Sequence, residues 1–254
     1  MLTNKFPILT YHSIDESESV ISVSDEMFGE QMDFLHKNDF NTVSLKTLAG
    51  FLIKRENLPP KTVALTFDDG YENFYTRAFP ILQKYNFTAT VFLITDYCGK
   101  RSDWSGNSTA LEQRKLMDWN KIKELNNYRI EFAAHSRTHP DLTKIPIADA
   151  ERQMAESKSE IESQLGTEAA NFAYPYGSFN REIKTLAEKY FRTAVSTNLG
   201  KIQIGDDKLQ LKRIDAYYLK NSRVFNRVLS GKFDEYLYLR QALRRLRAAW
   251  YNIK

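Results

Sequence analysis

The stretch ALTFDDGYEN, residues 64–73, runs apolar residues directly into two adjacent carboxylates, Asp68 and Asp69, which are followed by Gly70. Neighbouring carboxylates repel each other unless one of them is neutralised, well hydrated or bound to a cation. A surface turn is the simplest interpretation, because Asp-Gly pairs are common in turns. A functional interpretation requires partner residues elsewhere, so the segments on both sides of this stretch have to be considered.

Segments rich in β-branched and aromatic residues alternate with segments of helical spacing along most of the chain. This alternation is typical of parallel strands in a barrel or a doubly wound sheet, and hence of an α/β fold. Because no Pro- and Gly-rich linker divides the chain, we expect one catalytic domain over residues 1–220 and a basic helical extension over 221–254. The expected strands cover residues 6–11, 42–45, 61–67, 88–94, 129–134, 170–174, 193–196 and 208–212, and the longest expected helices cover 150–165 and 181–190.

Two further helices are indicated by apolar residues three or four positions apart. Phe28, Met32 and Leu35 have this spacing, and Asp25 is the expected N-cap of their helix. Asp118 is the expected N-cap of the other helix, because an aspartate oxygen accepts hydrogen bonds from the free N–H groups of a first turn.

The composition limits the class of protein. The chain has 254 residues, of which 42% are hydrophobic, and this is enough for the core of a barrel. The single cysteine, Cys98, excludes an internal disulfide framework and favours a reducing compartment. The first residues do not resemble a secretory signal, and no stretch approaches the roughly 18 apolar residues of a membrane span. We therefore expect a cytoplasmic protein.

The net charge of +4 is concentrated in residues 239–254, which hold five basic and no acidic residues, so that the rest of the chain is at −1. A near-neutral body argues against binding of nucleic acid. The tail pattern is that of a basic amphipathic helix, and two interpretations stay open: peripheral contact with the inner membrane surface, or docking on the barrel. The apolar residues of this pattern are Leu239, Leu243, Leu246 and Trp250, and the flanking basic residues are Arg240, Arg244 and Arg247.

Polar residues follow the ends of several expected strands. In parallel α/β folds, catalytic residues gather beyond the carboxyl ends of the strands. The positions of these polar residues therefore predict a single site on one rim of the fold. Its members are His12, Asp68, Asp69, His135, residues 174–177, Arg213 and Asp215.

HSRTHP, residues 135–140, places two histidines four positions apart. Pro140 disfavours helical geometry at His139, so a loop or a single turn is expected there. Alone, the pair could be two exposed loop histidines. With Asp69 it forms the two-histidine, one-carboxylate ligand set of a catalytic zinc site. A bound cation would allow Asp68 and Asp69 to ionise side by side.

These motifs resemble those of the polysaccharide deacetylases, the NodB-homology carbohydrate esterases. TFDDG at 66–70 and HSRTHP at 135–140 match the first two motifs of the family, and YPYG at 174–177 is similar to the third. The resemblance extends over about residues 6–215. It implies a distorted (β/α)7–8 barrel that removes N-acetyl groups from amino sugars with a divalent metal, which we expect to be Zn²⁺.

The resemblance also implies roles for individual residues. Asp68 would be the general base, and the backbone N–H of Tyr176 would bind the oxyanion beside a substrate-binding Pro175. The metal ligands would be Asp69, His135 and His139. The substrate would be an N-acetylated glycan; a lipid-linked saccharide is expected only from the basic tail and the missing secretory signal, since both would fit contact with the inner membrane surface. A deformylase or another deacylase, and a catalytically silent sugar-binding module, are the alternatives.

The sequence departs from the family pattern in two places. The third motif usually begins with an Arg that pairs with the catalytic base, and Ala173 stands there instead. We expect Arg213 to supply that charge. No histidine follows His139, whereas the family usually takes its general acid from a Leu-x-His motif near the C-terminus. LTYH at 9–12 is similar to the opening of the permuted poly-N-acetylglucosamine deacetylases, so we expect His12 to be the acid; a structural histidine bonded to the backbone is the alternative.

Aromatic residues near the expected site have two interpretations. Trp104 lies in the long polar connection of residues 98–117, where it could stack on a sugar ring or anchor the connection to the barrel. Tyr217 and Tyr218 have the same ambiguity.

Overall fold

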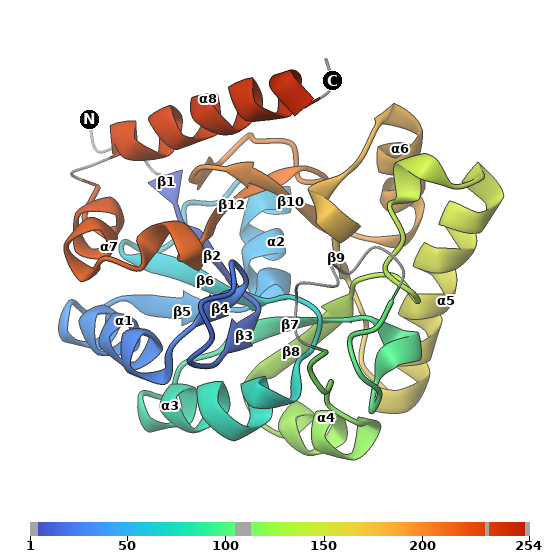
Figure 1. Cartoon of the computed structure of the whole chain (residues 1–254), viewed down its shortest axis with the longest axis horizontal. Helices are drawn as coiled ribbons and strands as arrows, with labels where there is room; N and C mark the ends of the chain where they lie inside the picture. Colours follow the sequence, from blue (N-terminus) through green and yellow to red (C-terminus); the bar gives the residue numbers. More distant parts are fainter. Residues whose placement is uncertain (1–4, 105–112, 232–233, 252–254) are drawn as a thin grey trace.

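The structure, a computed structural model, describes residues 5–104, 113–231 and 234–251, with side chains of the last segment described up to residue 243. Seven parallel strands close into a barrel, because the first of them pairs with strands on both sides (Figure 1). In order around the barrel they are β2 Ile8–Tyr11, β12 Leu211–Asp215, β10 Thr193–Leu199, β9 Asn171–Ala173, β8 Ile130–Ala134, β7 Ala89–Leu93 and β6 Thr62–Phe67.

Further short strands lie outside the closed ring. β5 pairs with β6, β1 pairs antiparallel with β11, and β3 pairs with β4. The expected (β/α)7–8 barrel is therefore confirmed, whereas the domain boundary at residue 220 stays a prediction. These strands span β5 Asn41–Val43, β1 Lys5–Phe6, β11 Ile202–Gln203, β3 Ser13–Ile14 and β4 Ser22–Val23.

Helices surround the barrel, and their apolar faces form the core together with the strands. None of the helices in the described ranges is long and apolar enough to cross a membrane. The helices are α1 Asp25–Lys37, α2 Leu45–Lys54, α3 Phe79–Lys84, α4 Trp119–Asn126, α5 Ile147–Leu165, α6 Arg181–Tyr190, α7 Ser222–Leu229 and α8 Asp234–Tyr251.

The N-cap of α1 differs from the prediction. Ser24, not Asp25, occupies this position, and its hydroxyl accepts a hydrogen bond from the Met27 N–H at 3.2 Å. Asp25 is the first helical residue, where its negative charge favours the positive end of the helix dipole. Asp118 does cap α4, since its carboxylate accepts from the Lys121 N–H at 3.0 Å.

The last barrel strand begins later than the sequence pattern indicates. We expected residues 208–212, and β12 covers Leu211–Asp215. Asp207 accepts a hydrogen bond from the Leu209 N–H and so forms a turn, and the strand begins only after this turn. Arg213 consequently lies within the strand and is buried, instead of following its end.

The C-terminal helix packs along the outside of the barrel, beside β10 (Figure 1). Leu237 is buried, and the Gln241 side chain accepts a hydrogen bond from the Leu199 N–H. Leu239 and Leu243 are 61% and 51% exposed, so the helix docks through a different face from the predicted apolar stripe. The other members of the pattern, Arg244, Arg247, Leu246 and Trp250, have side chains outside the described part of the chain.

Gly177 is held in the left-handed region at φ +69°, and a Cβ there would lie 2.6 Å from the backbone nitrogen of Thr197. We expect Gly177→Ala to lower the free energy of unfolding by roughly 2–4 kcal/mol, because conformational strain and a backbone clash act together. Gly166 is the matched control, since it has φ +65° and a Cβ added there would meet no atom within 4 Å. Urea unfolding of both alanine variants would measure the difference, and equal losses would contradict a steric role of Thr197.

Candidate metal centre and catalytic site

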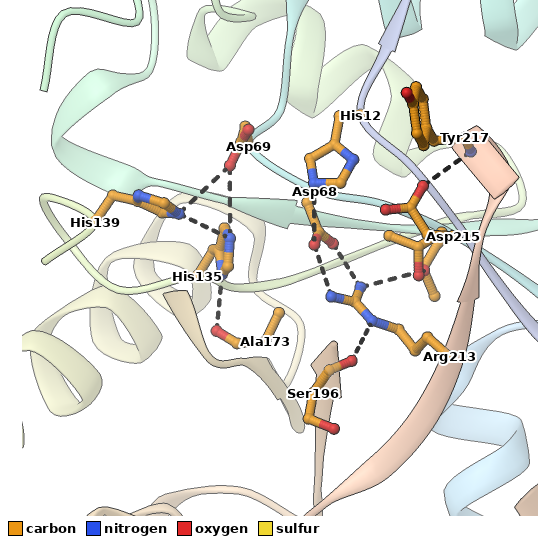
Figure 2. Close-up of polar contacts among 12 residues, drawn as sticks. His12, Asp68, Asp69, His135, His139, Ala173, Ser196, Arg213, Asp215 and Tyr217 are labelled. Carbon is orange, nitrogen blue, oxygen red and sulfur yellow. Dashed lines mark hydrogen bonds and ion pairs between the residues drawn. The ribbon is translucent and has the colours of Figure 1, made fainter. Parts of the chain in front are cut away.

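Asp69, His135 and His139 form a buried cluster at the carboxyl ends of β6 and β8 (Figure 2). One ligand atom from each lies within 4.8 Å of the other two. The Asp69 Oδ1 is 3.5 Å from the His135 Nε2 and 3.7 Å from the His139 Nε2, and the two nitrogens are 3.2 Å apart. The residues that the sequence assigns to one ion are therefore in one place.

A tight turn beyond β8 brings the two imidazoles together. Ser136 and His139 both have left-handed backbone conformations, with φ of +66° and +60°. The Ser136 hydroxyl accepts a hydrogen bond from the His139 N–H at 3.0 Å, which holds the turn closed. The pair thus lies in a loop, as Pro140 predicts.

The donor set fits a divalent transition metal. The His135 Nδ1 lies 2.7 Å from the Ala173 carbonyl oxygen, which can only accept, so this nitrogen carries the proton and Nε2 keeps its lone pair. Such an outer hydrogen bond is typical of metal-binding histidines. Burial, and then the neighbouring His135, lower the pKa of His139 well below its ordinary value, so its ring stays neutral and able to coordinate. Two imidazole nitrogens and one carboxylate oxygen are a common ligand set of catalytic zinc.

Asp68 forms a bidentate ion pair with Arg213 inside the barrel (Figure 2). The two terminal nitrogens of the guanidinium each donate to a different carboxylate oxygen, both at 2.7 Å, and its Nε donates to the Ser196 carbonyl at 3.0 Å. Burial would raise the pKa of Asp68, but the charge and hydrogen bonds of Arg213 outweigh it and hold the pKa well below its usual value. Arg213 on β12 thus supplies the positive charge that an Arg at the position of Ala173 supplies in the usual family pattern.

His12 lies on the other side of the same carboxylate. Its Nε2 is 3.8 Å from the Asp68 Oδ2. The register explains this proximity, because β2 and β6 pair in parallel with Tyr11 opposite Phe67. His12 and Asp68 each follow these partners by one residue, so they emerge next to each other at the rim.

The third motif borders the metal cluster. Tyr176 has a left-handed backbone at φ +59°, is 44% exposed, and its ring centroid lies 4.6 Å from that of His139. Pro175 beside it is buried. Tyr176 therefore lies between the cluster and the solvent, whereas Pro175 contributes to the framework below it.

Trp104 does not present an exposed face. Its side chain is only 4% exposed, and its ring centroid lies 5.1 Å from that of His139 and 5.3 Å from that of Tyr97. The proposed stacking of a sugar on this residue is corrected accordingly, because other side chains cover the indole. Trp104 instead packs against His139, a candidate metal ligand, and so anchors the connection in which it lies.

Two groups of residues around the site were missed by the sequence reasoning. The buried Tyr71 hydroxyl donates a hydrogen bond to Asp69. The sequence did offer one indication of this contact, because Tyr71 stands in the opening stretch, two residues after Asp69. Asn73 from the same stretch donates to the Ser13 hydroxyl at 2.6 Å and so connects this stretch to the residue after His12.

Arg114 fixes the segment that follows His12. Its Nε donates to Asp15 at 2.9 Å, and one terminal nitrogen donates to Ser17 at 2.7 Å and to Ser22 at 3.1 Å. The three partners are nearly 100 positions away in sequence, and no motif pointed to this contact.

The chain is similar in sequence to known proteins. The family model for polysaccharide deacetylase matches residues 55–195. The putative polysaccharide deacetylase YxkH of Bacillus subtilis is 30% identical over 197 residues, which are 77% of this chain and 66% of YxkH. A poly-beta-1,6-N-acetyl-D-glucosamine N-deacetylase of Staphylococcus aureus is 27% identical over 79% of this chain and 74% of its own length.

A solved structure is also similar. The deacetylase PplD of Streptococcus pyogenes, determined in complex with acetate, has a TM-score of 0.74 and 28% identity, covering 83% of this chain and 92% of PplD. The family match spans more than half of the chain and includes the opening stretch and both histidines of the cluster. On the match of its sequence and the shared barrel, this chain belongs to the polysaccharide deacetylase family.

Proposed function

We propose that the protein is a metal-dependent hydrolase that removes N-acetyl groups from an amino-sugar-containing glycan. The observation that carries this proposal is the placement of an ionised, arginine-paired Asp68 directly beside the buried cluster of Asp69, His135 and His139. A module that only binds sugars requires neither a base nor metal ligands next to it. The related proteins support the substrate class, because the Staphylococcus aureus relative is named for poly-beta-1,6-N-acetyl-D-glucosamine.

The residues of the site have different roles in the proposed reaction. A divalent cation, which we propose to be Zn²⁺ held by Asp69, His135 and His139, would act as a Lewis acid and make water a stronger acid. Asp68 is kept ionised by Arg213, so it can accept the proton of the attacking water. The backbone N–H of Tyr176 would donate to the oxyanion that develops on the amide carbonyl.

Acetate release tests this function. The protein would be incubated with β-1,6-linked N-acetylglucosamine oligosaccharides before and after dialysis against a chelator, and acetate and formate would both be measured. We expect acetate release that the chelator abolishes and that added Zn²⁺ restores. Formate release from N-formylated oligosaccharides alone would support the deformylase alternative, and binding without any release would support the silent module.

His12 is proposed to protonate the departing amine, since it lies next to Asp68 at the rim. An amine needs a proton to leave, whereas a phenolate with a low pKa does not. We expect His12→Ala to reduce kcat for the N-acetylated sugar by about 10²-fold or more, with a much smaller loss for 4-nitrophenyl acetate. Equal losses on both substrates would contradict the assignment of His12 as the acid.

The location of the protein is a separate proposal. We propose that it is cytoplasmic and that residues 239–254 contact the inner membrane surface, where a lipid-linked saccharide could be the substrate. The support is the basic tail and the exposed Leu239 and Leu243 on α8. Sedimentation with anionic liposomes tests the contact, and undiminished binding after deletion of 239–254 would contradict it.

A further inference from the structure

The Asp69 carboxylate accepts a hydrogen bond from a residue outside the metal cluster. The donor is the Tyr71 hydroxyl, two positions further along the chain. Tyr71 belongs to a small buried cluster beside the site, which also contains Ile94, Trp104 and Leu116. Because such surroundings hold little water, a hydrogen bond to a charged group is stronger there than at the surface. The contact can therefore hold the Asp69 side chain firmly.

A second hydroxyl stands behind Tyr71. The buried Ser102 side chain donates to the Tyr71 oxygen, and its own oxygen accepts from the Arg114 N–H at 2.9 Å. Each hydroxyl has a single proton to donate, so the direction of the chain is fixed. The Arg114 N–H points to Ser102, the proton of Ser102 to Tyr71, and the proton of Tyr71 to Asp69. We call Tyr71 and Ser102 the hydroxyl pair.

Main-chain hydrogen bonds hold the hydroxyl pair in place. The Met117 N–H donates to the Gly70 carbonyl at 2.9 Å and so joins the end of the 98–117 connection to the opening stretch. Within the connection, the Ser102 N–H donates to the Arg114 carbonyl at 2.8 Å. The segment that carries Ser102 is therefore tied to the segment that carries both carboxylates before an ion binds.

The orientation of Asp69 requires such support. Both of its close contacts with the imidazoles are made by Oδ1, at 3.5 Å from His135 and 3.7 Å from His139 (Figure 2). The backbone does not fix this orientation, because an aspartate side chain can turn about two bonds. A carboxylate has about four lone-pair sites, so it can accept the bond from Tyr71 and still bind an ion.

The three candidate ligands differ in their outer contacts. The His135 Nδ1 donates to the Ala173 carbonyl at 2.7 Å. The His139 Nδ1 is buried and has no hydrogen-bond partner among the residues that the structure describes. Without the Tyr71 hydroxyl, His135 would be the one ligand side chain in the described part of the chain to keep an outer hydrogen bond of the kind that orients metal ligands.

We propose that the hydroxyl pair positions Asp69 for metal binding, with Tyr71 bonded to the ligand and Ser102 acting through Tyr71. Both are positioning residues, since each would act on the ion through Asp69. This inference rests on the proposed function, because it concerns the ion that the proposed reaction requires. It adds that the 98–117 connection belongs to the metal site, although the three candidate ligands lie outside it.

The affinity for Zn²⁺ tests this inference. Metal-free protein would be titrated with Zn²⁺ in competition with a chromophoric chelator, and the dissociation constants of the variants compared. We expect Tyr71→Phe to weaken binding by about 10–100-fold, the usual effect of removing an outer partner of a metal ligand. Tyr11→Phe is the matched control, because Tyr11 is equally buried and its hydroxyl donates to the Gln31 side chain instead. The Zn²⁺ affinity of Tyr11→Phe should equal that of the wild type.

Ser102→Ala is the second variant, and it keeps the proposal testable should Tyr71→Phe unfold. We expect Ser102→Ala to weaken Zn²⁺ binding by a smaller factor than Tyr71→Phe, because the Tyr71 hydroxyl is still present. The double variant should bind Zn²⁺ as Tyr71→Phe does, since Ser102 acts only through that hydroxyl. Independent structural roles would instead give losses that add. The proposal is overturned if the losses add, or if neither single variant changes the affinity.

Acetate release from the same preparations separates this inference from the proposed function. Zn²⁺ binding that depends on Tyr71, without any acetate release by the wild type, would contradict the reaction and support the positioning role. Zn²⁺-dependent acetate release together with an unchanged affinity of Tyr71→Phe would support the reaction and overturn the positioning role. A wild type that binds no Zn²⁺ would overturn both.

Discussion

Asp69→Asn is expected to abolish both metal binding and turnover, with kcat/KM reduced by at least about 10³-fold. Asp69 is the only carboxylate in the cluster, and its Oδ1 lies within 4 Å of both imidazole nitrogens. An amide oxygen has no charge and is a much weaker ligand, so the two histidines would be left to hold the ion alone. Metal content after gel filtration and acetate release from the oligosaccharide would be measured on the same preparation.

Asp68→Asn is the matched control, because it changes the neighbouring residue in the same way. Asp68 faces Arg213 and His12 instead of the cluster. We therefore expect Asp68→Asn to retain bound metal and to lose about 10²–10⁴-fold in kcat, the usual effect of removing a general base. Loss of metal from Asp68→Asn, or full activity of metal-free Asp69→Asn, would contradict the division of roles between the two carboxylates.

The position of the site could be predicted from sequence because it depends on strand ends. His12, Asp68 and His135 each stand directly after a buried strand, and the parallel closure of the barrel brings those ends to one rim. The order of strands around the barrel was not needed for this prediction. A parallel fold of either kind would place the residues on the same side of the sheet.

Other features could not be predicted because they depend on tertiary packing. The apolar pattern does not show whether Trp104 is covered, since its burial results from tertiary contacts, among them those with Tyr97 and His139. The contact between Arg114 and Asp15 joins segments 99 positions apart, which no local pattern encodes. The late start of β12 results from a turn at Asp207, and a short apolar run does not reveal such a shift.

Arg213→Ala is expected to change stability, activity and their pH dependence together, because it removes the ion pair of Arg213 and Asp68. Both side chains are almost completely buried. Removing one partner of a buried pair leaves an uncompensated charge, so we expect the free energy of unfolding at pH 7 to fall by roughly 3–5 kcal/mol. Arg213→Lys keeps a positive charge without the bidentate geometry and should lie between Arg213→Ala and the wild type.

The sign of the pH effect follows from the pKa of Asp68, which is held below its usual value in the folded chain, chiefly because Arg213 outweighs the opposing effect of burial. A carboxyl with a lowered folded pKa stabilises the fold above its unfolded pKa of about 4, and this contribution is lost as the pH falls through the folded value. Without Arg213, burial is the largest remaining effect on the pKa of Asp68 and raises it, so we expect the ionised carboxylate to become unfavourable at neutral pH. Arg213→Ala should therefore lose less stability at pH 5 than at pH 7.

The same shift should appear in catalysis, because Asp68 must be ionised to act as the proposed base. We expect the acidic limb of the kcat/KM profile to move to higher pH by at least about one unit in Arg213→Ala. The double variant with Asp68→Asn is the control, since it removes the uncompensated charge and should recover part of the lost stability while staying inactive. An unchanged acidic limb in Arg213→Ala, or a double variant less stable than Arg213→Ala, would show that Arg213 does not set the charge of the base.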